Sequence, residues 1–79
     1  MITYQATFYK TESNFENIQY DKRKKNLKGR TAALAYARKE KKRGKYFCVL
    51  IDNQDDYDDH DNTTVIYQQG RPKNFVEQV

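Results

Sequence analysis

Six consecutive apolar residues run from Tyr46 to Ile51, and several of them are aromatic or β-branched. A run of this length that is apolar on both faces predicts a strand at the centre of a sheet. The chain has 79 residues, of which 37% are hydrophobic. This is less than the roughly 45–50% of ordinary globular domains. We therefore expect one small folded domain, residues 1–79, with a thin core.

A second strand pattern occupies the start of the chain. Ile2, Tyr4, Ala6 and Phe8 alternate with polar neighbours, as expected for a half-buried strand. Residues 15–20 contain enough aromatic and aliphatic side chains to form a returning strand, and residues 21–29 have no apolar periodicity and are expected to be a loop. The predicted strands are therefore 2–10, 15–20, 45–52 and 63–69.

One helix is expected between these strands. Thr31 is a suitable N-cap, good helix formers follow over 31–43, and Gly44 is a typical C-terminal stop. Ala33, Leu34, Ala37 and Lys41 share one stripe, so the helix can lie close to a sheet. The order ββαββ predicts an α+β fold: a four-stranded, mainly antiparallel sheet with the helix packed on one face. Whether 74–79 adds a strand is left open.

Charge is distributed very unevenly along the chain. Twelve of the fifteen basic residues lie between Lys22 and Lys45 and are opposed there only by Glu40, which gives this segment a charge of +11. The segment from Asp52 to Asp61 carries six aspartates and no lysine or arginine. Fields of this strength attract oppositely charged partners. The sequence alone does not identify them.

The basic segment favours binding to nucleic-acid phosphates, because lysines and arginines on a loop and a helix can follow a charged backbone. Tyr20 and Tyr36 flank the segment and could stack on unpaired bases. The alternative is a solvated surface whose charge only maintains solubility. The candidate phosphate-binding residues are Lys22, Arg23, Lys24, Lys25, Lys28, Arg30, Arg38, Lys39, Lys42 and Arg43.

The acidic loop, residues 52–62, has three interpretations. An EF-hand would need a glycine where Tyr57 stands and a glutamate where Thr63 stands, so no metal site is expected. The loop could bind a basic protein partner, or it could be a solvated loop that opposes aggregation. The candidate protein-binding residues are Asp55, Asp56, Tyr57, Asp58 and Asp59.

Catalysis is not expected. The single Cys48 lies within a strand, where a small buried hydrophobic residue is expected, and there is no glycine-rich phosphate loop. We expect no cofactor, no small-molecule substrate and no membrane partner, and a cytoplasmic location, because no leader or apolar span is present. Among the tyrosines, Tyr46 and Tyr67 are expected in the core, and Tyr9 and Tyr57 on the surface.

The compact plan, the start MITYQATFYK and the Lys/Asn/Tyr/Asp-rich usage resemble those of small proteins of bacterial viruses and mobile elements. Some anti-CRISPR inhibitors have a similar sheet with one helix, where the stretch GRTAALAYARKEKKRG would lie between strands. The resemblance implies a non-enzymatic inhibitor that binds a protein effector through surface charge. It includes no motif from which a site residue can be transferred. Nucleic-acid binding is the leading hypothesis, and a protein-interaction module is the alternative.

Overall fold

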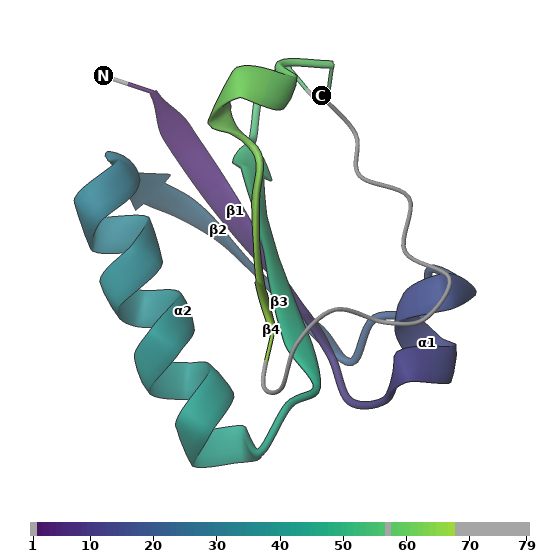
Figure 1. Ribbon diagram of the computed structural model, residues 1–79. Helices are drawn as coiled ribbons and strands as arrows, with labels where there is room; N and C mark the ends of the chain where they lie inside the picture. Colours follow the sequence, from purple (N-terminus) through teal and green to yellow (C-terminus); the bar gives the residue numbers. More distant parts are fainter. Residues whose placement is uncertain (1, 57, 68–79) are drawn as a thin grey trace.

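The computed structural model describes residues 2–56 and 58–67 (Figure 1). Their elements, in chain order, are β1 (Thr3–Tyr9), α1 (Glu12–Glu16), β2 (Lys22–Lys28), α2 (Arg30–Gly44), β3 (Cys48–Asn53), the 3-10 helix η1 (His60–Asn62) and β4 (Thr64–Tyr67). The expected segment 74–79 and the last two residues of the expected strand 63–69 lie outside the described residues.

The strands form one antiparallel sheet in the order β2-β1-β3-β4. Since β2 and β3 both run antiparallel to β1, they are parallel to each other. Helix α2 connects them and crosses one face of the sheet (Figure 1). The predicted α+β class with a four-stranded sheet is confirmed. The predicted order ββαββ is wrong, because a short helix lies between β1 and β2.

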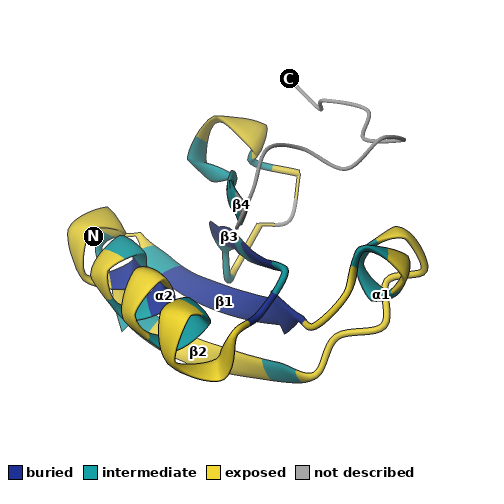
Figure 2. Cartoon of the chain, turned by 60° about the horizontal axis from the view of Figure 1, so that its bottom comes forward, coloured by how far each residue is buried: buried dark blue, intermediate teal, exposed yellow. Residues whose placement is uncertain are grey.

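The core lies between α2 and this face of the sheet. Tyr4, Ala6 and Phe8 of β1 pack with Val49 and Ile51 of β3. Ala33 and Ala37 of α2 are fully buried above them, so the predicted alanine contact with the sheet is confirmed. Burial of each large apolar side chain stabilises the fold by about 1.5–3 kcal/mol. In Figure 2 β1 is almost entirely buried, whereas the outer side of α2 is exposed.

The segment 15–20 is not a strand. Thr11 caps helix α1 by accepting a hydrogen bond from the backbone N–H of Asn14 on its side-chain oxygen (3.0 Å). Glu12 lies in the first turn, where its charge complements the helix dipole. The helix ends at Glu16, and residues 19–20 have no regular structure. The expected strand 15–20 is therefore replaced by the end of a short helix and the turn that follows it.

The segment 21–29 is not a loop, because β2 occupies most of it. Its side chains are largely exposed, and Leu27 is the half-buried apolar member. The strand forms because β1 supplies backbone hydrogen-bond partners along its free edge, with a bulge between Tyr4 and Ala6. An edge strand stabilised mainly by backbone pairing need not show an apolar alternation.

Helix α2 is one residue longer at each end than expected. The N-cap residue of α2 is Gly29, whereas the sequence predicted Thr31. The backbone of Gly29 has a φ of 88°, a conformation that favours glycine. Gly44 is the last helical residue, so the left-handed position after the helix is occupied by Lys45, with φ 54° and ψ 42°. Tyr46 then enters the core, as predicted, before β3 begins at Cys48.

The face of the sheet opposite α2 is also buried, and this corrects two expectations. Tyr9 was expected on the surface, but it is only 3% exposed and its ring meets Phe15 of α1 edge-on at 5.2 Å. Asp52 was assigned to the acidic loop, but it belongs to β3 and pairs with Gln5 of β1. Both Gln5 and Asp52 are buried. The side chain of Tyr67 lies outside the description.

Candidate functional site

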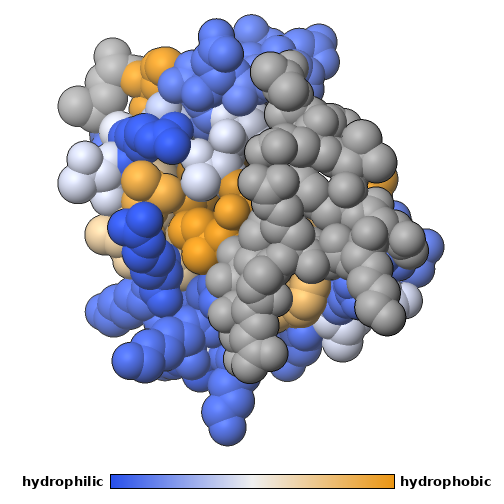
Figure 3. Space-filling model, viewed as in Figure 1, coloured by the Kyte–Doolittle hydropathy of each residue, from blue (hydrophilic) through white to orange (hydrophobic). Residues whose placement is uncertain are grey.

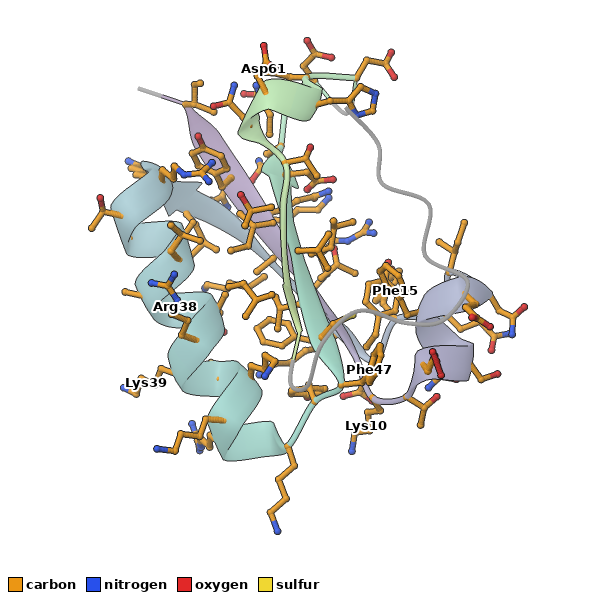
Figure 4. All side chains as sticks on the ribbon, in the orientation of Figure 1. Lys10, Phe15, Arg38, Lys39, Phe47 and Asp61 are labelled. Atoms are coloured by element: carbon orange, nitrogen blue, oxygen red, sulfur yellow. The ribbon has the colours of Figure 1, made fainter. Side chains whose placement is uncertain are left out.

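The acidic loop lies at one end of the molecule, whereas the basic residues extend from that end, where Arg30 contacts Thr64, to the last turn of α2. The acidic connection between β3 and β4 carries Asp61 at one end, and Lys10 lies at the other (Figure 4). The last turn of α2, with Lys41, Lys42 and Arg43, reaches the same end as Lys10. Figure 3 shows hydrophilic surface at both ends of this view and apolar atoms gathered beside α2.

Four of the ten candidate phosphate-binding residues have partners within the protein. Lys22 and Arg43 both contact the carboxylate of Glu40. The Arg23 Nε atom donates to Thr7 Oγ1 at 3.1 Å, and Arg30 Nη2 donates to Thr64 Oγ1 at 2.7 Å. The contacts of Lys22, Arg23 and Arg30 join different strands and the helix, so these three residues have a structural role. Arg43 contacts Glu40 within α2 and remains 77% exposed.

The other six candidates are exposed and make no hydrogen bond or ion pair with the described residues. They are Lys24, Lys25, Lys28, Arg38, Lys39 and Lys42. They do not share one surface. Lys24 pairs with Ala6 and lies on the α2 side of the sheet, whereas Lys28 pairs with Thr3 and lies on the opposite side. The ten candidates therefore do not form one continuous surface.

Two of the six lie beside the contact between β2 and α2. Lys24 is two residues from Lys22 on the same side of β2, and Lys39 directly precedes Glu40 on α2. Lys22 Nζ lies 3.2 Å from Glu40 Oε1, so each partner of this ion pair has an exposed lysine within two residues of it in the chain. Figure 4 shows Lys39 projecting away from the sheet. We call Lys24, Lys39 and Arg43, together with the Lys22–Glu40 pair, the basic flank.

Glu40 is the centre of the basic flank and is largely buried, with 13% of its side chain exposed. Its hydrogen bond from Lys22 lowers the pKa of the carboxyl group, and the charges of Lys22 and Arg43 act in the same direction. Lys22 also lies 4.8 Å from the centre of the Phe8 ring. Glu40 therefore neutralises part of the cationic charge while holding Lys22 over the core.

A shallow hollow of about 320 Å³ opens beside this pair, lined by Lys22, Glu40, Arg43, Gly44 and Tyr46. Both cations of the lining already contact Glu40. The Tyr46 hydroxyl donates to Asp21 Oδ2 at 2.8 Å. The charged and hydroxyl groups of the lining thus each have a partner within the protein, and Lys22 and Arg43 keep further N–H donors.

The acidic loop is organised around Asp59. The Asp59 Oδ2 atom accepts hydrogen bonds from the side-chain amides of Asn53 and Asn62, and these bonds lower the pKa of its carboxyl group. Asn62 Oδ1 in turn accepts from the Tyr4 hydroxyl at 3.0 Å. Of the five candidate protein-binding residues, Asp55, Asp56 and Asp58 are exposed, Asp59 is half-buried in this network and Tyr57 is outside the described residues.

The sequence did not identify the buried polar pair Gln5–Asp52. Neither polar atom of the Gln5 amide, nor Asp52 Oδ1, has a hydrogen-bond partner among the described residues. Burial raises the pKa of the Asp52 carboxyl group, and the charge of Arg23 opposes the shift. The alternation around Gln5 predicted a side chain on the face away from the helix, but it gave no indication that this face is buried.

Cys48 is fully buried, as expected, and burial raises the pKa of its thiol to about 12. A thiol with such a pKa stays protonated and unreactive at neutral pH. Within residues 2–56 and 58–67, the His, Cys, Asp and Glu side chains form no cluster of three or more that could hold a metal ion. No helix in the same part of the chain is long and apolar enough to cross a membrane.

The chain matches no protein family model, no curated protein and no solved structure.

Proposed function

We propose that this protein is a small non-enzymatic module that binds nucleic-acid phosphates through the basic flank. The observation that supports the proposal is that Lys24 and Lys39, each within two residues of a partner of the Lys22–Glu40 pair, are exposed and have no ion pair or hydrogen bond among the described residues. The strand and the helix that carry these lysines are joined by the Lys22–Glu40 ion pair, so binding requires no rearrangement of the backbone. Release of counterions from the phosphates supplies the driving force.

The test is fluorescence anisotropy with labelled DNA and RNA oligonucleotides at several salt concentrations. The double variant Lys24→Glu/Lys39→Glu should weaken binding and reduce the slope of log affinity against log salt by about two, since each lost phosphate contact removes about one. The matched control is Lys28→Glu/Arg38→Glu, which changes the net charge equally but alters exposed residues outside the flank.

The control should retain most of the affinity. Equal weakening by both double variants would indicate diffuse attraction without a defined surface and would contradict the flank as the binding site. A complementary variant is Glu40→Gln, which removes the only acid of the basic segment. It should tighten binding, provided that Lys22 stays near its present position.

The alternative is a protein-interaction module that binds a basic partner through the acidic loop. Asp55, Asp56 and Asp58 favour it, because they are exposed on a connection that Asp59 holds in shape. Replacing these three by Asn should abolish binding of a basic partner such as polylysine, measured by the same anisotropy assay. Retained binding would contradict a role for the loop.

A further inference from the structure

Tyr20 and Arg23 form a stacked pair beside the first residues of β2. The Arg23 guanidinium carbon lies 4.4 Å from the centre of the Tyr20 ring. The Arg23 Nε atom donates to Thr7 Oγ1 at 3.1 Å, and this bond fixes the guanidinium on the sheet. Tyr20 is nevertheless 49% exposed and is not part of the hydrophobic core cluster. The pair is thus an ordered aromatic and cationic surface that remains accessible.

The two tyrosines that flank the basic segment differ in this respect. Tyr36 is half-buried and meets Phe8 edge-on, with 6.2 Å between the ring centres. It therefore belongs to the packing of α2, whereas Tyr20 keeps much of its ring free. A flat ring or guanidinium plane of this kind can stack on a nucleic-acid base, and such stacking is insensitive to base identity.

The pair is also close to cations of the basic flank. Lys24 is four positions after Tyr20 in the chain, which corresponds to at most about 13 Å for an extended backbone. Lys22 and Lys24 lie on the α2 side of β2, and Arg23 pairs with Thr7 on the other side. A flexible strand could therefore place phosphates on the flank and a base on Tyr20. A rigid duplex keeps its bases stacked on one another and cannot.

We infer that Tyr20, stacked on Arg23, is a platform for an unpaired base and that the ligand class is single-stranded nucleic acid. This inference rests on the proposed function. Tyr20 contributes contact with the base, and the basic flank contributes contact with the phosphates.

The experiment compares three probes of equal length by fluorescence anisotropy: a single-stranded oligothymidine, an oligonucleotide of the same length with abasic sites, and a DNA duplex. Tyr20→Leu should weaken binding of the oligothymidine about tenfold, the loss of one stacked base. It should leave the abasic and duplex affinities unchanged, because neither offers an unpaired base. Tyr20→Phe, which keeps the ring, should bind like the parent protein.

A second readout uses the absence of tryptophan from the chain. Tyr20→Trp introduces a single indole, and its emission should be quenched when the oligothymidine binds and unchanged when the abasic oligonucleotide binds. Thr31→Trp, an exposed position in the first turn of α2, is the control and should show no quenching.

The outcomes separate the two proposals. If the protein binds all three probes and Tyr20→Leu changes none of the affinities, Tyr20 does not stack on a base. The proposal that the basic flank binds phosphates is then unaffected. If no probe binds at low salt, the proposed function fails and the platform fails with it.

Discussion

Asp52 and Gln5 face each other across β3 and β1, and both are buried. Neither polar atom of the Gln5 amide nor Asp52 Oδ1 has a hydrogen-bond partner among the described residues. Burial raises the pKa of Asp52 above its usual value of 3.8. Because the pKa is higher in the folded than in the unfolded protein, ionisation of Asp52 costs stability. The cost is absent at pH values below 3.8, grows as the pH rises through the raised folded pKa, and is complete above it.

Replacing Asp52 by Asn should therefore stabilise the protein at neutral pH, by about 1–3 kcal/mol, because it removes a buried charge and supplies a donor for the Gln5 amide oxygen. Urea unfolding followed by circular dichroism from pH 3.5 to 8 would measure this. The advantage of the variant should grow with rising pH. Asp55→Asn, at an exposed position, is the control, and an equal gain there would contradict the explanation.

Gly44 is required by the ring of Tyr46. A Cβ atom added to Gly44 would lie 2.8 Å from Tyr46 Cδ2 and even nearer to Cε2, and Tyr46 is only 7% exposed. Alanine normally stabilises a helix relative to glycine. Here we expect Gly44→Ala to lower the free energy of unfolding by about 1–3 kcal/mol through overpacking. Denaturant unfolding would show this.

The matched experiment repeats Gly44→Ala in a Tyr46→Leu background. The penalty should shrink there, because the ring atoms that the new methyl group meets are gone. If Gly44→Ala lowers the free energy of unfolding equally in both backgrounds, the loss of stability does not come from the Tyr46 ring and must arise in the helix backbone.

Ile18 occupies a left-handed backbone position, with φ 56°, directly after the α1 C-cap. Its N–H donates to the Phe15 carbonyl, and the Gln19 N–H donates to the Asn14 carbonyl at 2.8 Å. These two bonds form a Schellman motif, in which glycine is the usual residue at this position. A β-branched residue is strained there, and Ile18 is 76% exposed, so it gains little from burial.

Ile18→Gly should consequently raise the free energy of unfolding by about 1 kcal/mol. The control is Asn17→Gly, because Asn17 has a φ of −95° and needs no left-handed conformation. That substitution should only destabilise. A loss of stability in both variants, measured by thermal unfolding, would contradict strain at Ile18.

Glu40 should make stability depend on pH in the opposite direction to Asp52. Its hydrogen bond from Lys22 lowers the folded-state pKa below the usual 4.5. The contribution is present above pH 4.5 and is lost as the pH falls through the lowered pKa. Glu40→Gln should lower the melting temperature at pH 7 and have less effect at pH 3. A difference that does not vary with pH would show that the ion pairs contribute nothing.

The α+β class and the contact between α2 and the sheet could be predicted because they depend on local patterns. The alternation of Tyr4, Ala6 and Phe8 and the stripe of Ala33 and Ala37 were both correct. Strand β2 could not be found in this way. Its residues are mostly charged, and it forms through backbone pairing with β1.

The sequence indicated which basic residues are candidates for the site, but it did not indicate how the fold arranges them. The ten basic residues were identified from their number and spacing. Nothing in the sequence indicated that Arg23 and Arg30 bind neighbouring threonines, or that Lys24 and Lys28 lie on opposite sides of one strand. Such differences depend on strand register, because successive side chains of a strand point to opposite faces of the sheet. A shift of one residue in the pairing would move every side chain to the other face.

The sequence by itself determined which segments have an apolar face, where the opposite charges are concentrated, and that Cys48 is a buried strand residue. Only the tertiary structure decided which cations are engaged by Glu40 and which remain exposed, and that Asp52 is buried opposite Gln5. The physical reason is that hydrophobic periodicity is a local property of the chain. Edge pairing, burial of a polar face and the partner of a charge depend on residues that only folding brings together.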